Sequence, residues 1–256
     1  MRVIIMILIC LAYNIIFGQD HVVEKFESNS VEALKHSGWK DIIEVSIPAT
    51  APDPSFQIIE TKNEKDKITS AVQLKKTVST SCGMFKAIKE RGDYYMQSDV
   101  RIDSWSNSSR PFFTDWAIAI GFFTVIEGWD FNGGPQITFV AQPVSNNLVL
   151  YALRADAKAN EFFNIEFPEK VELNVWYCFS IYVENKTGKV HTKVIEKDTN
   201  KTIHNTTTLI PDWDSENSGN FKNFGFWDGE YNTDATKGNQ VTIDNILFSR
   251  KSKKDK

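Results

Sequence analysis

Residues 174–190 read NVWYCFSIYVENKTGKV, and this stretch decides the fold. Apolar side chains recur at every second position: Tyr177, Phe179, Ile181 and Val183. A period of two places them on one face of a β-strand and leaves the other face mixed. Residues 184–189 form a turn in which Gly188 can take a positive φ, and the apolar alternation resumes at Val190. The stretch therefore predicts a strand–turn–strand unit inside a sheet, and we expect its mixed face to border a ligand groove.

The rest of the chain repeats this pattern of short strands separated by Asn, Gly, Asp, Ser and Pro clusters. The predicted strands are 22–28, 56–61, 70–78, 94–105, 115–126, 135–142, 147–155, 162–167, 176–184, 189–197, 201–209, 223–227 and 240–249. Long helical periodicity is absent, although residues 29–38 predict a short helix capped by Ser30 or Asn29 and stopped by Gly38. The sequence predicts an all-β protein, a jelly-roll β-sandwich of two antiparallel sheets.

Composition narrows the range of partners. The chain has 256 residues, a formal net charge of -4, 41% hydrophobic residues and 12% aromatic residues. These are ordinary values for a globular protein, and no basic stripe favours nucleic acid as a partner.

The N-terminus predicts export. Arg2 precedes an apolar run at residues 3–17, which Gly18 and Gln19 follow. We interpret residues 1–19 as a signal peptide, 20–250 as one jelly-roll domain and 251–256 as a basic tail. The alternative is a membrane anchor, but the run is shorter than the ~20 residues of a spanning helix and contains Asn14. We therefore expect a secreted protein, extracellular or periplasmic, that does not span a membrane.

Two cysteines follow the predicted signal peptide, Cys82 and Cys178. They can form a disulfide in an exported chain, or they can be two buried free thiols, because a domain of this size needs no covalent staple. The sequence has no CxxC and no HExxH pattern, so it predicts no zinc site.

Three segments resemble the concanavalin A-like lectin/glucanase superfamily, which includes laminin-G-like domains. Residues 176–190 look like its element of a tryptophan, a strand, a Gly-Lys turn and a second strand. Residues 241–248, with Ile-Asp-Asn at 243–245, are similar to the closing strand of these jelly rolls. Phe26-Glu27 followed by Gly38-Trp39 resembles the start of secreted sugar-active members. The resemblance implies a jelly roll with a sugar-related role; the superfamily holds lectins, hydrolases, lyases and adhesion domains.

Catalytic patterns of this superfamily are incomplete in the chain. The Glu-x-Asp-x-x-Glu strand of its hydrolases does not occur. Its alginate-lyase-like members carry Gln-Ile-His on a strand; here Gln136 matches, but Thr138 stands at the histidine position. Tyr151 and Arg154 on the next predicted strand are candidate groups for binding an acidic sugar. The alternative is that Gln136 and Tyr151 are ordinary strand residues.

Loops that combine tryptophan with acidic or amide residues are the best candidates for sugar binding. A sugar stacks its apolar face on an aromatic ring, and planar polar side chains fix its hydroxyls. Candidate pairs are Trp129 with Asp130 and Trp227 with Asp228; Trp105 and Trp213 lie in similar loops. The alternative for each tryptophan is that it closes an end of the sandwich.

A structural Ca²⁺ is implied by the resemblance, with Glu27 near the first strand and Asp244 on the last strand as ligands. The alternative is a hydrogen-bonded acidic pair at the edge of a sheet. No Asp-x-Asp-x-Asp-Gly loop accompanies the two residues.

Three functions remain open from the sequence. The leading hypothesis is a lectin-like protein that binds a polysaccharide or glycan through aromatic, Asp and Asn side chains. The first alternative is an enzyme, either a polysaccharide lyase or a glycoside hydrolase. The second alternative is a laminin-G-like module for protein adhesion.

Overall fold

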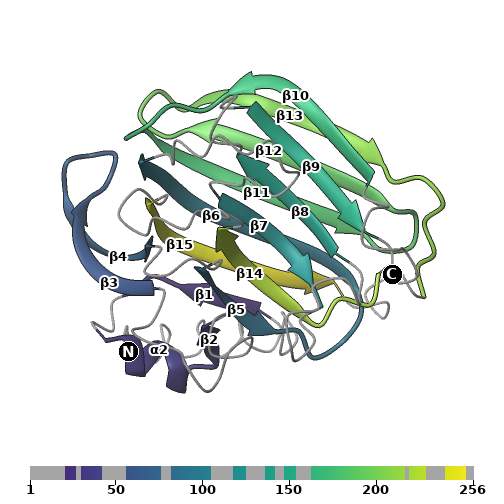
Figure 1. Ribbon diagram of the computed structural model, residues 1–256, viewed down its shortest axis with the longest axis horizontal. Helices are drawn as coiled ribbons and strands as arrows, with labels where there is room; N and C mark the ends of the chain where they lie inside the picture. Colours follow the sequence, from purple (N-terminus) through teal and green to yellow (C-terminus); the bar gives the residue numbers. More distant parts are fainter. Residues whose placement is uncertain are drawn as a thin grey trace, which may run out of the picture.

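The computed structural model describes residues 21–26, 30–41, 56–75, 82–104, 118–124, 136–141, 147–153, 163–216, 219–228 and 240–251. Within the strands, this description excludes the side chains of Lys75, Cys82, Leu153, Trp227, Asp228 and Lys251. Strands dominate, and they form two antiparallel sheets that lie face to face (Figure 1). The predicted jelly-roll β-sandwich is therefore confirmed.

The larger sheet has eight strands, with β1 paired to β15 beside the main path. Its order is β13 (Lys201–Leu209), β12 (Lys189–Glu196), β11 (Trp176–Glu184), β6 (Asp93–Ser104), β15 (Gln240–Lys251), β4 (Ile68–Lys75) and β3 (Phe56–Lys62), and β1 is His21–Glu24. The chain leaves and re-enters this sheet repeatedly, as a jelly roll requires.

The smaller sheet has seven strands. Its order is β10 (Phe163–Lys170), β9 (Asn147–Leu153), β8 (Gln136–Ala141), β7 (Ile118–Phe123), β14 (Asn223–Asp228), β5 (Cys82–Ala87) and β2 (Trp39–Asp41). The helix α2 (Val31–His36) precedes β2, and its N-terminus is capped by the Ser30 hydroxyl, which accepts from the Ala33 amide at 3.1 Å. Gly38 follows the helix with φ 97°, as expected for a stop.

The stretch at residues 174–190 forms β11, a turn and the start of β12, as predicted. The apolar positions of β11 belong to the core between the sheets, and the strand lies between β6 and β12. Gly188 has φ 71° in the turn. A Cβ at Gly188 would lie 2.4 Å from the Trp213 ring, so both backbone conformation and space require glycine.

Two strands were not predicted. β2 has three residues, which is too short for a visible alternation. β5 reads CGMFKA, and two of its outward positions hold Gly83 and Phe85, so its apolar residues do not alternate with polar ones. Each predicted strand lies on an observed one, with bounds that differ by a few residues.

Aromatic side chains fill the space between the sheets. Phe224 on β14 stacks on Phe248 on β15, with ring centroids 4.1 Å apart and planes at 5°. Phe122 on β7 contacts both Phe248 and Tyr94. Burying rings of this size is the main favourable contribution to folding.

The two sheets differ in how their outer faces are covered. Every residue of β7 and β8 is buried, so both faces of the seven-stranded sheet are shielded from solvent at its centre. Along β11, buried and half-buried residues largely alternate, because the outer face of the eight-stranded sheet is partly exposed. The described part of the chain contains no helix of the length and apolarity that crossing a membrane requires.

One buried histidine links the two sheets at an edge. His204 on β13 contacts the Thr192 hydroxyl at 2.8 Å and Glu169 of β10 at 3.3 Å. Its ring lies against Phe167, at 4.5 Å between centroids, and against Phe139. Burial lowers the pKa of His204, and the neighbouring Glu169 carboxylate opposes this effect only in part.

Replacing Gly188 with alanine tests the turn. We expect Gly188→Ala to lower the free energy of unfolding by about 2–5 kcal/mol, from the left-handed backbone together with the clash with Trp213. Gly38→Ala is the control: its φ is also positive, but its nearest obstacle is the flexible Lys86 side chain at 3.6 Å, so we expect about 1–2 kcal/mol. Equal losses in denaturant unfolding would contradict the role of Trp213.

Acid is expected to weaken the fold through His204. An unfolded histidine takes up a proton near pH ~6.5, whereas folded His204 does so at lower pH. The stability that the neutral ring contributes is therefore full above about pH 6.5 and is lost as the pH falls below it. Unfolding free energies measured from about pH 8 to about pH 5 should fall less steeply in His204→Gln than in the unsubstituted protein. An unchanged slope in His204→Gln would contradict the role of this ring.

Candidate functional site

On the outer face of the seven-stranded sheet, five residues from neighbouring strands lie in a row that runs across the strands. None of the five belongs to the core between the sheets. Pairing between neighbouring strands aligns one residue from each of β5, β14, β7, β8 and β9: Phe85, Gly225, Gly121, Thr138 and Tyr151. We call these five residues the outer row. Their chain neighbours, such as Phe224, Phe122 and Phe139, point into the core, so the outer row faces away from the other sheet.

Two glycines lie side by side at the centre of the outer row. Gly121 pairs with Gly225 across β7 and β14. A Cβ on Gly121 would lie 2.1 Å from the Ile137 carbonyl oxygen, and one on Gly225 would lie 2.2 Å from the Met84 carbonyl oxygen. No side chain therefore projects from the sheet between Thr138 and Phe85. The two glycines form a shallow depression in the outer face, with the aromatic residues Phe85 and Tyr151 at the ends of the row.

Polar side chains border the row on one side. Gln136 and Asn223 both pair with Phe123, and all three are buried. The Gln136 amide donates to the Thr138 hydroxyl at 3.5 Å, a long hydrogen bond. These amides and this hydroxyl lie outside the packing between the two sheets, and because they are buried they need hydrogen-bond partners on the outer face.

The structure brings together two of the predicted ligand residues. Gln136 on β8 and Tyr151 on β9 are diagonal neighbours on the same face, and Thr138 lies directly opposite Tyr151. Trp227 and Asp228 lie on β14, with Trp227 two residues from Gly225, but their side chains are outside the description. Trp129, Asp130 and Arg154 lie outside the described residues.

Sequence reasoning missed the remaining members of this surface. Phe85, Gly121, Phe123, Asn223 and Gly225 lie in runs that read as continuously apolar or as glycine-interrupted strands. The available signal was the glycine at an outward position of both 118–123 and 223–228. Trp213, another candidate platform, is instead structural: its indole N–H donates to the Asn185 carbonyl at 2.7 Å and its ring contacts Phe221.

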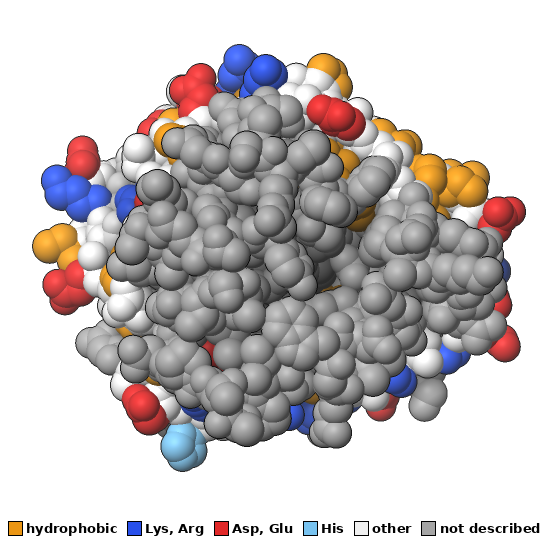
Figure 2. All heavy atoms as spheres, in the orientation of Figure 1, with side chains coloured by type: hydrophobic (Ala, Val, Ile, Leu, Met, Phe, Trp, Pro, Cys, Tyr) orange, Lys and Arg blue, Asp and Glu red, His pale blue; other side chains and the backbone are white. Residues whose placement is uncertain are grey.

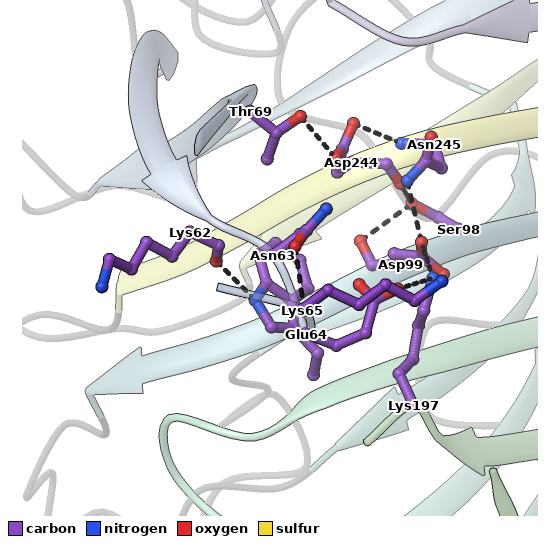
Figure 3. A network of polar contacts seen from close by, with 11 residues as sticks. Lys62, Asn63, Glu64, Lys65, Thr69, Ser98, Asp99, Lys197, Asp244 and Asn245 are labelled. Atoms are coloured by element: carbon purple, nitrogen blue, oxygen red, sulfur yellow. Dashed lines mark hydrogen bonds and ion pairs between the residues drawn. The ribbon is translucent and has the colours of Figure 1, made fainter. Parts of the chain in front are cut away.

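A second polar region lies on the outer face of the eight-stranded sheet (Figure 3). It comprises Glu64, Thr69, Asp99, Lys197, Asp244 and Asn245, which we call the outer polar network. The mixed face of β11 lies on this sheet, so the groove expected beside β11 and the pair of Gln136 and Tyr151 belong to opposite faces of the sandwich.

A β-bulge in β15 shapes the outer polar network. Asn245 has φ 50°, and the register of β15 against β6 shifts between Asp244 and Leu247. As a result, Asp244 is the Cα partner of Asp99 across the two strands. The side-chain amide of Asn245 also donates a hydrogen bond to the Asp99 carboxylate, at 2.9 Å. Lys197 donates to the same Asp99 carboxylate and lies 3.8 Å from Glu64.

Burial is the largest cause of the pKa shifts of Asp244 and Cys178 in this region. Burial raises the pKa of Asp244 to about 6, and the charge of Asp99 adds to this rise. The hydrogen bond from the backbone amide of Asn245 acts in the opposite direction. Burial likewise raises the pKa of the Cys178 thiol to about 12, and Asp99 adds to the shift. Cys178 is a free thiol in its protonated form, so it is neither in a disulfide nor a ready nucleophile.

Of the two calcium ligands expected from the sequence, only Asp244 is among the described residues. Glu27 lies outside them. The Asp244 carboxylate accepts hydrogen bonds from the Asn245 amide at 2.7 Å and the Thr69 hydroxyl at 3.3 Å, and its carbonyl accepts from Ser98 at 2.9 Å. No group of three or more His, Cys, Asp or Glu residues suited to a metal occurs in the described part of the chain.

Charge elsewhere on the surface is dispersed. On the face seen in Figure 2, the described Lys, Arg, Asp and Glu side chains are scattered around the rim of the molecule. The described part of this face thus offers no patch of a single sign for nucleic acid.

Comparison with known proteins identifies the fold. No protein-family model matches the chain, and no curated protein matches it. Among solved structures, the cellulose-induced protein Cip1 is 14% identical and aligns over 89% of this chain and 96% of its own, with a TM-score of 0.53. Arcelin-5, a lectin-like defence protein from Phaseolus vulgaris, is 10% identical and aligns over 83% of this chain and 98% of its own, with a TM-score of 0.49. The VIP36 exoplasmic/lumenal domain is 10% identical, aligning over 82% and 89%, with a TM-score of 0.49. The chain has the concanavalin A-like lectin/glucanase fold.

Proposed function

We propose that the protein binds a carbohydrate, a polysaccharide or glycan, through the outer row and the polar residues beside it. The observation that carries the proposal is the strip of Gly121 and Gly225 between the aromatic residues Phe85 and Tyr151. A low strip flanked by rings accommodates the flat face of a sugar, and each ring offers a surface for its C–H bonds.

The polar groups beside the strip suit sugar hydroxyls. Thr138 supplies a hydroxyl and Gln136 and Asn223 supply amides, each of which can both donate and accept. All of them are buried, so a sugar reaches them only when this face of the sheet opens to solvent, and its hydrogen bonds would then form in a desolvated setting, where an unmatched group is costly. This favours discrimination between sugars by the position of their hydroxyls.

A polysaccharide lyase is the second candidate, and one observation favours it. Gln136 and Tyr151 lie on the same face of adjacent strands, where a tyrosine can take a proton from a sugar while an amide binds the neighbouring carboxylate. Thr138 occupies the position at which the lyase pattern has histidine, so the tyrosine would act without that partner.

Secretion completes the proposal. The apolar N-terminal residues 1–19 support export before the domain folds, and a glycan-binding protein outside the cell meets its ligand there. N-terminal sequencing of the exported protein tests this point: a mature chain that begins near Asp20 supports it, and a retained Met1 contradicts it.

Binding should depend on two hydroxyls of the outer row. Retention on immobilised neutral and acidic polysaccharides identifies a ligand, and calorimetry then measures its affinity. Thr138→Val and Tyr151→Phe each remove one hydroxyl with little change in shape, so we expect affinity to fall about 5–10-fold in each. The control is Tyr182→Phe on the outer face of the other sheet, which should bind as well as the unsubstituted protein.

Two results would redirect the assignment. Loss of binding in Tyr182→Phe alone would move the site to the eight-stranded sheet. Formation of an unsaturated, ultraviolet-absorbing product from an acidic polysaccharide, abolished in Tyr151→Phe, would replace binding by lyase activity.

A further inference from the structure

Lys197 reaches into the outer polar network from the end of β12. Its backbone is fixed by a hydrogen bond from its amide to the Trp176 carbonyl at 2.9 Å. Its ammonium group donates to Asp99 and lies 3.8 Å from Glu64 on the turn between β3 and β4 (Figure 3). The side chain is 22% exposed, and those of Asp99 and Glu64 are 7% and 16% exposed.

Carboxylates gather around this one ammonium group. Asp99 is the Cα partner of Asp244 across β6 and β15, and Glu64 approaches from the hairpin. The neighbouring Arg101 is engaged elsewhere, because its guanidinium donates to Asp103 at 2.6 Å. Buried carboxylates this close repel one another unless a cation compensates them.

The ammonium group is held in its charged form. Burial by itself lowers the pKa of Lys197, but the hydrogen bond to Asp99 and the charges of Asp99 and Glu64 raise it above its ordinary value. Lys197 therefore carries a positive charge at neutral pH.

The same contacts tie the β3–β4 hairpin to the sheet. The Lys62 carbonyl accepts from the Trp176 indole at 2.9 Å, and Glu64 follows it toward Lys197. Figure 1 shows this hairpin standing at one side of the sandwich, away from most of the other strands. A cation at this position thus has a second role, because it joins the hairpin to β6.

We propose that the Lys197 ammonium group is the built-in cation of the outer polar network, and that it provides the charge balance which the family resemblance would assign to Ca²⁺ at Asp244. The network in the native protein therefore binds no calcium. This inference is independent of the proposed carbohydrate site, which lies on the other sheet.

Thermal unfolding with excess calcium chloride or excess chelator tests the proposal. The response of the native protein to calcium, whatever its size, should be the same in Asp244→Asn. Lys197→Met removes the ammonium group and keeps the apolar stem, so in chelator we expect its Tm to fall by about 5–10 °C. Calcium should restore part of this loss, because Asp99 and Glu64 then lack their cation and the Asp244 carboxylate lies on the strand position paired with Asp99.

Matched variants separate the network from general effects of charge. Lys62→Met removes an ammonium group of the same hairpin that pairs with Asp66 at 3.5 Å in an exposed position, and it should leave Tm and its response to calcium nearly unchanged. The double variant Asp99→Asn with Lys197→Met removes both charges, so it should be more stable in chelator than Lys197→Met and should respond to calcium as the native protein does. If Lys197→Met does not fold, recovery of folding in this double variant supports the proposal by itself.

Three outcomes would overturn it. A calcium-dependent rise in the native Tm that Asp244→Asn abolishes would show a native metal site at this residue. An unchanged Tm of Lys197→Met in chelator would show that the carboxylates need no cation. A Lys197→Met variant that fails to fold, with a double variant that fails as well, would show that Lys197 acts by packing and not by charge.

Discussion

The packing of aromatic rings between the two sheets is the constraint on which the rest of the structure depends. Phe224 and Phe248 stack across the interface, and Phe122 and Tyr94 continue the contact to the neighbouring strands. Since side chains alternate along a strand, placing these rings inward fixes which residues face outward. A slip of one residue would bury Asp99 and Asp244 in the core, so the inner packing sets the position of both polar surfaces.

The apolar contacts that stabilise the fold lie between the inner faces of the two sheets, so the residues on the two outer faces can differ. The seven-stranded sheet uses neutral groups there, with glycines at Gly121 and Gly225 and hydroxyl and amide groups at Thr138 and Gln136. The eight-stranded sheet concentrates charge around Asp99, and the half-buried Tyr182 of β11 lies on the same face. The fold alone therefore does not determine function, which rests on these outer residues.

How far the sequence predicts this molecule depends on how local each signal is. Strand β11 was predictable because its alternation lies within one segment, and the turn was predictable because Gly188 stands where a positive φ is needed. The face to which Gly121 belongs was not, because the run IAIGFF is buried on both sides and gives no period. Gln136 and Tyr151 were proposed as ligand residues from a family resemblance, but their shared face needed the register of β8 and β9.

The motif Ile-Asp-Asn at 243–245 shows how one local pattern can serve different chemistry. The motif lies in β15, the last described strand, which pairs with β6 and β4 inside the larger sheet. The positive φ of Asn245 produces the bulge that gathers Asp244 and Asn245 near Asp99. Whether such a carboxylate pair takes a metal depends on what else reaches it. Here Lys197 arrives from the end of a strand distant in sequence, and Glu64 arrives from a hairpin on the other flank. A lysine held in this way supplies positive charge without a bound ion, because a covalently attached ammonium group has little translational entropy left to lose.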